Sequence, residues 1–125
     1  MPAKKLLIVD DSMIMRNRIA RAGADPRLAG VAIIGLARDG AEALKGAKEK
    51  APDLVTMDLT MPHMDGAACI AHMIAILPEV RILVVSALSD KVTAIRAIKQ
   101  GAHGFLHKPF DDGALVNSLL MLMRP

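Results

Sequence analysis

Apolar runs of strand length alternate with helix-length segments from one end of the chain to the other. Each run ends in turn residues, and a helical stretch follows before the next run begins. This alternation is typical of a parallel sheet that helices cover on both faces, in which the strands are apolar throughout. The pattern predicts strands at residues 5–10, 31–36, 54–58, 81–86 and 104–107. We therefore expect an α/β fold with an open, doubly wound sheet of five parallel strands.

Capping residues and apolar spacings of three and four predict the first three helices. The first begins near Ser12 and the second covers residues 40–50. The third begins near Asp65 or Gly66 and ends before Pro78, which cannot continue a helix. The side chains expected to face the sheet are Met15, Ile19 and Ala22 in the first helix, Ala41, Leu44 and Ala47 in the second, and Ala67, Ile70, Ala71 and Ile74 in the third.

The fourth helix is predicted from Ser89 or Asp90 to Gln100, and Gly101 suits its C-terminal cap. We expect its apolar stripe to pack on the sheet; this stripe consists of Val92, Ile95 and Ile98.

The fifth helix, capped by Asp111 or Asp112, is apolar on more than one side, and such a helix usually packs against more than its own sheet. We therefore expect part of its surface to bind a partner. Its apolar residues are Leu115, Val116, Leu119, Leu120, Leu122 and Met123.

Size and composition favour one cytoplasmic domain over residues 1–125. A chain of this length buries roughly two-thirds of its unfolded surface, so a hydrophobic core can form without disulfide bonds or bound metals. The single Cys69 excludes an internal disulfide, and no apolar run approaches the ~20 residues that cross a bilayer. The net charge of +3 is dispersed, and two Phe with no Trp or Tyr leave few rings for base stacking. We expect neither direct nucleic-acid binding nor membrane insertion.

Carboxylates, a hydroxyl and an ammonium group are predicted to meet at one edge of the sheet. The first strand leads to Asp10 and Asp11, the third ends at Asp58, the fourth ends at Ser86, and the fifth leads to Lys108. Open α/β sheets bind their ligands beyond the carboxyl ends of the strands. Helix N-capping is the alternative explanation for each Asp taken singly, but it accounts poorly for three Asp, a Ser and a Lys at the same edge.

Three carboxylates in one crevice demand a counter-charge or a raised pKa, because two of them about 4 Å apart repel by roughly 4 kcal/mol at an effective dielectric of 20. A site of carboxylate and carbonyl oxygens without His or Cys suits Mg²⁺, which often joins carboxylates to a phosphoryl oxygen. A carboxylate can also attack phosphorus to form an aspartyl phosphate. The four histidines lack the spacing of a zinc motif; of these, we expect His63 in a loop, His72 on a helix and His103 in a turn. Cys69 is predicted to be a small buried residue.

Four stretches together resemble the response regulator receiver domains of two-component signalling, especially the single-domain chemotaxis type. They are "VDDS" with "MR" shortly after, "PDLVTMDLTMPHMDG", "VVSA" and "GFLHKPF". The resemblance spans nearly the whole chain. It implies a flavodoxin-like (βα)5 domain with strand order 2-1-3-4-5, and a module that catalyses only its own phosphorylation and dephosphorylation.

The resemblance also implies a role for each matching residue. Asp58 becomes the phosphoacceptor. Asp11 binds Mg²⁺ directly, Asp10 holds it through water, and the carbonyl of Thr60 supplies a further ligand. The switch residues are the Ser86 hydroxyl and the Phe105 ring, where the chemotaxis type often has Tyr, and the phosphate is bound by Lys108, which a cis peptide joins to Pro109.

The implied partners are a histidine kinase or phosphotransfer protein as donor, and a downstream protein target. The target would bind a face formed by the fourth helix, fifth strand and fifth helix, and a phosphorylation-dependent dimer is an alternative use of that face. Three rival functions stay open: a receiver cut from a longer regulator with a DNA-binding or methylesterase domain, an aspartyl-phosphate phosphatase, and a pseudo-receiver that acts as a plain binding scaffold. The phosphatase is disfavoured because Thr60 stands where its general acid would be, and the scaffold because every charged site residue is present.

Overall fold

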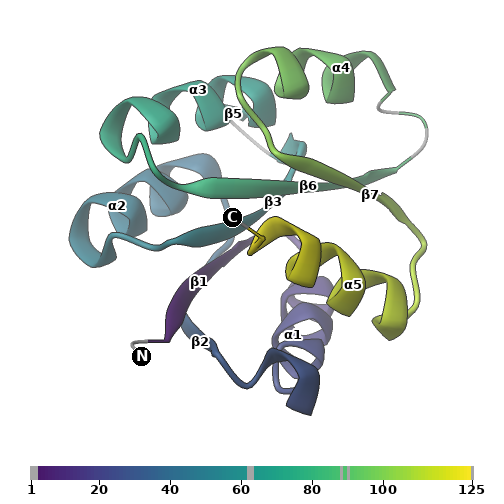
Figure 1. The fold of residues 1–125 in the computed structure, drawn as a ribbon. Helices are drawn as coiled ribbons and strands as arrows, with labels where there is room; N and C mark the ends of the chain where they lie inside the picture. The colour runs from purple at the N-terminus through teal and green to yellow at the C-terminus, as the bar shows by residue number, and fades with distance from the viewer. Residues whose placement is uncertain (1–2, 62–63, 88, 90, 125) are drawn as a thin grey trace.

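A central parallel sheet organises the computed structural model, which describes residues 3–61, 64–87, 89 and 91–124 (Figure 1). Its strand order is β2-β1-β3-β6-β7, so the chain starts at an inner strand and winds outward in both directions. This is the predicted order 2-1-3-4-5 when only the strands of the main sheet are counted. The strands are β1 (Lys4–Val9), β2 (Val31–Ala37), β3 (Leu54–Asp58), β6 (Arg81–Ala87) and β7 (Gly104–Lys108).

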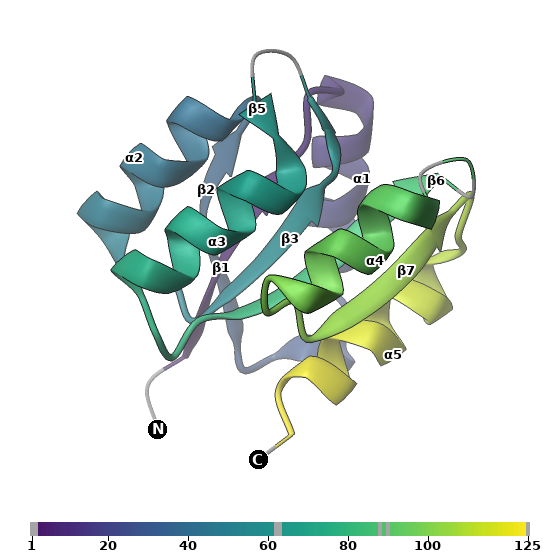
Figure 2. The same ribbon diagram turned by 90° about the horizontal axis from the view of Figure 1, so that it is seen from above.

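Helices cover both faces of the sheet, as Figures 1 and 2 show. One face packs against α2 (Gly40–Lys50), α3 (Gly66–Ile76) and α4 (Lys91–Lys99). The other packs against α1 (Met13–Ala22) and α5 (Asp112–Leu122). Two hydrophobic cores result, one on each side of strands whose residues alternate between them. None of the helices in the described ranges is long and apolar enough to cross a membrane.

The predicted strands are confirmed to within one residue at each end, but three short elements were not predicted. A small antiparallel pair, β4 (Thr60–Met61) with β5 (Met64–Asp65), lies between β3 and α3. A single 3₁₀ turn, η1 (Pro26–Leu28), precedes β2. Elements of two or three residues are too short to produce a hydrophobic period, so sequence patterning does not reveal them.

The inward face of α1 is as predicted, with Ile19 and Ala22 buried and Met15 packed beside them, whereas the faces of α2 and α3 were predicted only in part. In α2, Ala43 is buried in place of Ala41, which is exposed. In α3, the buried set includes Cys69 and Met73, while the predicted Ala71 and Ile74 are only partly covered.

The helix α4 is confirmed, but the prediction of which of its faces packs on the sheet was wrong. Val92, Ile95 and Ile98 face outward, with 74%, 50% and 48% of their surface exposed. The residues that face the sheet are Ala94 and Ala97. Small side chains allow the helix axis to lie close to the strands, and the larger aliphatic residues are then directed outward. The predicted cap is confirmed, since Gly101 adopts a φ of 116° just after the helix, where a side chain would be strained.

The excess apolar surface expected on α5 does not exist. Leu115, Val116, Leu119 and Leu122 are buried in the chain's own core, and Leu120 and Met123 pack against it. Among the described residues of this helix, Met121 is the large apolar side chain that is mainly exposed. Of these two helices, α4 therefore has more exposed large apolar side chains than α5 among the described residues.

Candidate functional site

The carboxyl ends of the parallel strands bring the predicted charged residues together. Asp10 follows β1, Asp58 ends β3, and Lys108 ends β7. Oxygen atoms of Asp10, Asp11 and Asp58 lie within 4.8 Å of one another, and among the described residues no other group of His, Cys, Asp or Glu clusters in this way. The cluster thus lies at the carboxyl ends of the strands, where the sequence predicted it.

Asp10 is fixed in place by a full set of partners. Its side chain is 1% exposed, one carboxylate oxygen accepts a bond of 2.9 Å from the Ser12 backbone N–H, and the other lies 3.1 Å from Lys108 Nζ. Its backbone carbonyl accepts a bond of 2.8 Å from Arg16 Nη1. Asp10 is therefore held by several contacts, whereas Asp11 beside it is exposed.

Asp58 is buried and electrostatically disfavoured as a carboxylate. Burial, together with the nearby charge of Asp10, raises its pKa to about 7. Lys108 and the backbone N–H of Thr60 act in the opposite direction: Lys108 Nζ lies 3.6 Å from Asp58 Oδ1, and the Thr60 N–H donates to the same oxygen over 3.3 Å. One ammonium group therefore does not balance three carboxylates, and the cluster favours a further cation.

Lys108 is shared between two carboxylates. Burial works against its ammonium form, but the charges of Asp58 and Asp10 outweigh burial and raise its pKa. The ammonium is therefore retained at neutral pH beside the carboxylates. The peptide bond between Lys108 and Pro109 is cis, as the resemblance implied.

Ser86 lies next to the site with no bonding partner for its hydroxyl. The residue is fully buried, and among the described residues nothing hydrogen-bonds its Oγ. A buried hydroxyl without a partner is costly, so such a group calls for an explanation. Thr56, two residues before Asp58, has the same property.

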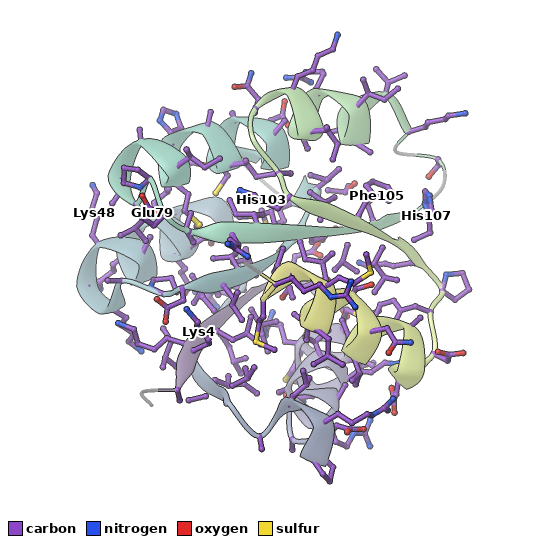
Figure 3. All side chains as sticks on the ribbon, viewed as in Figure 1. Lys4, Lys48, Glu79, His103, Phe105 and His107 are labelled. Atoms are coloured by element: carbon purple, nitrogen blue, oxygen red, sulfur yellow. The ribbon has the colours of Figure 1, made fainter. Side chains whose placement is uncertain are left out.

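Phe105 and Ser86 point to the same face of the sheet, toward α4, because Ser86 pairs with His107 and side chains alternate along β7. The Phe105 and His107 rings contact edge to face, with centroids 4.3 Å apart, and Figure 3 shows both at the β7 edge. A shallow hollow beside them is lined by Lys91, Ala94, Ile95, Ile98, Phe105 and His107.

The site opens to solvent through a second hollow, lined by Asp11, Asp58, Thr60, Ala87, Ser89 and Lys108. Ala87 and Ser89 were not predicted as lining residues, since small residues after a strand carry no distinctive signal. The N-cap explanation for the three aspartates is wrong, because Ser12 caps α1 and Asp65 caps α3.

The remaining candidates lie apart from the acidic cluster. His72 is exposed on α3, and His103 precedes β7, where its Nδ1 accepts a bond of 3.1 Å from the Ile82 N–H (Figure 3). His63 lies outside the described residues. Cys69 is buried as predicted, and burial raises the pKa of its thiol to about 11.

Comparison of the sequence with protein families matches residues 6–120 to the response regulator receiver domain. The chain is 40% identical over 120 residues to the chemotaxis protein CheY of Thermotoga maritima, covering 93% of this chain and 94% of that protein. It is also 40% identical to a protein-glutamate methylesterase/protein-glutamine glutaminase of Photobacterium profundum, over 86% of this chain but 27% of that protein.

Solved structures agree with this relationship. The receiver domain of AraT, a response regulator from Geobacillus stearothermophilus, superposes with a TM-score of 0.89 at 29% identity, covering 96% of this chain and 92% of that one. A complex of CheX, CheY, BeF3 and Mg²⁺ from Borrelia burgdorferi contains a chain with a TM-score of 0.87 at 29% identity, covering 97% and 90%. The chain belongs to the response regulator receiver domain family, and it is a signalling module similar to CheY.

Proposed function

We propose that Asp58 accepts a phosphoryl group from a histidine kinase or phosphotransfer protein, and that this modification switches a protein-binding face. The observation that carries the proposal is the cluster of Asp10, Asp11 and Asp58 with Lys108 at the strand ends. We further propose that this activity is cytoplasmic and belongs to a chemotaxis-like pathway; the similarity to CheY supports this.

The donor atoms suit Mg²⁺, since they are hard oxygens carrying more negative charge than Lys108 balances. Asp11, Asp58 and the carbonyl of Thr60 would hold the ion directly, and Asp10 would hold it through water. When bound, Mg²⁺ supplies positive charge that offsets the charge of the phosphoryl oxygens.

The chain's own residues provide the nucleophile and its electrostatic support. A carboxylate oxygen of Asp58 attacks the donor phosphorus, the bond from phosphorus to the donor breaks, and the donor leaves with the electron pair. Lys108 stands 3.6 Å from Asp58 Oδ1, where its ammonium offsets charge on the transferred group. The Thr60 N–H, which already donates to Asp58, helps to orient it.

The switch is proposed to use the unpartnered hydroxyl of Ser86. A phosphoryl oxygen on Asp58 would accept its hydrogen bond, the end of β6 would shift toward Asp58, and the Phe105 ring would turn inward. This explains why a buried hydroxyl is tolerated without a partner in the unmodified chain.

The output face is proposed to lie on α4 and β7. Exposed Ile95 and Ile98 line the hollow that contains Phe105, and exposed Val92 lies on the same helix, so a turn of that ring would reshape the surface that a target meets. The contribution expected from α5 is reduced to its exposed Met121. Phosphorylation-dependent pairing of two chains remains an alternative use of this face.

Phosphoryl uptake tests the proposal. The chain is incubated with acetyl phosphate, with Mg²⁺ or with EDTA, and its intact mass is measured over time. We expect one phosphoryl group to be added in Mg²⁺ only, and none in Asp58→Asn. Asp39→Asn is the matched control because Asp39 caps α2, and Asn is an equally good cap. Equal uptake by Asp58→Asn and Asp39→Asn would refute the assignment.

A second candidate is the regulatory domain of a longer protein, because the methylesterase relative matches this chain over only part of its own length. The single domain proposed for residues 1–125 and this alternative predict the same site chemistry. The length of the native reading frame separates them.

A further inference from the structure

An arginine on α1 reaches across to the segment that follows Lys108. The guanidinium of Arg18 donates from Nη2 to the backbone carbonyl of Phe110, 92 residues away in sequence. Its Cζ atom lies 4.8 Å from the centroid of the Phe110 ring, and its Nε lies 3.8 Å from Asp112 Oδ1. Three kinds of contact thus converge on one side chain.

These contacts hold the backbone segment that follows Lys108 in the sequence, where the chain leaves β7. Before Lys108, β7 pairs with β6; after it, Phe110 is anchored by its buried ring and by Arg18. Lys108 itself reaches 3.1 Å to Asp10 and 3.6 Å to Asp58. A shift of the segment at Phe110 would therefore be transmitted to the ammonium two residues earlier.

The same helix also holds the opposite side of the site. Ser12 caps α1 immediately after the two aspartates, and Arg16 donates to the carbonyl of Asp10 over 2.8 Å. Helix α1 is therefore tied by Arg16 to the strand end that carries Asp10, and by Arg18 to the segment that follows Lys108. Helix α1 thus contacts the backbone next to both charged partners.

We propose that Arg18 is a positioning residue that sets the place of Lys108 in the phosphoryl-transfer site. This inference rests on the proposed function, because Lys108 matters only if Asp58 receives a phosphoryl group. The ion pair with Asp112 adds little, since 70% of that side chain is exposed. The carbonyl contact and the ring contact carry the role, and both use the planar, permanently charged guanidinium.

Loss of Arg18 should slow the reaction more than it harms the fold. Misplacement of a reacting group by about 1 Å can cost on the order of a hundredfold in rate. We expect Arg18→Met to lower the rate constant of phosphorylation by acetyl phosphate at least about tenfold, with the cooperative urea unfolding transition retained. Arg21→Met is the matched control, because Arg21 lies exposed one turn further along α1.

A double-mutant cycle separates positioning from general structural support. Arg18→Met is measured in the wild-type chain and in Lys108→Met. If Arg18 acts through Lys108, its substitution has no further effect on the rate once Lys108 is gone. An equal loss in both backgrounds would overturn the proposal, as would equal rates for Arg18→Met and Arg21→Met.

Arg18→Lys is a second, milder variant that keeps the charge but loses the planar group. We expect an intermediate loss of rate that also disappears in Lys108→Met, and a full wild-type rate in Arg18→Lys would count against the proposal. If the wild-type chain itself takes up no phosphoryl group, the proposed function fails and this inference fails with it. If the wild type is phosphorylated and the cycle shows no coupling, only this inference fails.

Discussion

Replacing Asp58 by Asn should make the chain more stable at neutral and alkaline pH in the absence of Mg²⁺. The cause is the environment of Asp58, which is buried beside Asp10 with only Lys108 as a nearby cation. Asn fills nearly the same space but cannot ionise. The substitution therefore removes an unfavourable charge without opening a cavity.

The magnitude follows from the shift in pKa. The pKa of Asp58 is about 7 in the folded chain, against 3.8 for an exposed aspartate carboxyl group. Between these values the folded state retains a proton that the unfolded state releases, so stability falls as pH rises from about 4 to about 7. Each pKa unit corresponds to about 1.4 kcal/mol, so the loss is roughly 4 kcal/mol and is complete above pH ~7.

Urea unfolding followed by far-ultraviolet circular dichroism, in EDTA and at a series of pH values, measures this effect. The difference in unfolding free energy between Asp58→Asn and wild type should be small near pH 4 and should grow to a few kcal/mol near pH 8. Saturating Mg²⁺ should reduce the difference at pH 8, because a cation that binds the native carboxylates stabilises the wild type. A difference that stays constant with pH would refute the electrostatic reasoning.

Other substitutions test the switch and the output face. Thr56→Val and Ser86→Ala should each raise the unfolding free energy by about 1 kcal/mol, because each removes a buried hydroxyl that lacks a partner; a loss of stability would reveal a partner. Only Ser86→Ala should also weaken binding of the phosphorylated chain to its target, and undiminished binding would exclude the Ser86 switch. Ile95→Ser should change stability by less than ~0.5 kcal/mol yet weaken target binding, since Ile95 is half exposed; unchanged affinity would place the face elsewhere. Mg²⁺ titration should shift amide resonances at residues 10–12 and 58–60, and shifts confined to the histidines would argue against the carboxylate site.

The strands and the acidic cluster could be predicted from sequence because both depend on local patterns. A buried parallel strand must be apolar along its length, and its carboxyl end must lie at the ligand edge of the sheet. Asp10, Asp58 and Lys108 each lie at the carboxyl end of a strand, so predicting the strand boundaries was enough to place them. No long-range contact had to be guessed to bring them together.

The outward face of α4 could not be predicted in this way. Periodicity identifies an apolar stripe on a helix, but it does not show whether that stripe or a row of alanines meets the sheet. Ala94 and Ala97 allow a closer approach than Ile95 and Ile98, and the structure uses the closer packing. The contacts of Arg18 were missed for a related reason, since a bond to a backbone carbonyl 92 residues away has no local sequence signature.

Direct identification of the modified residue is the strongest test of whether Asp58 accepts the phosphoryl group. The chain, treated with acetyl phosphate and Mg²⁺, is reduced with borohydride, which converts an aspartyl phosphate to homoserine, and its peptides are sequenced by mass spectrometry. If Asp58 is the phosphoacceptor, we expect homoserine at position 58 in the phosphorylated chain only, with Asp10 and Asp11 unchanged. Homoserine at another aspartate, or a phosphoryl group on a histidine with Asp58 intact, would contradict it.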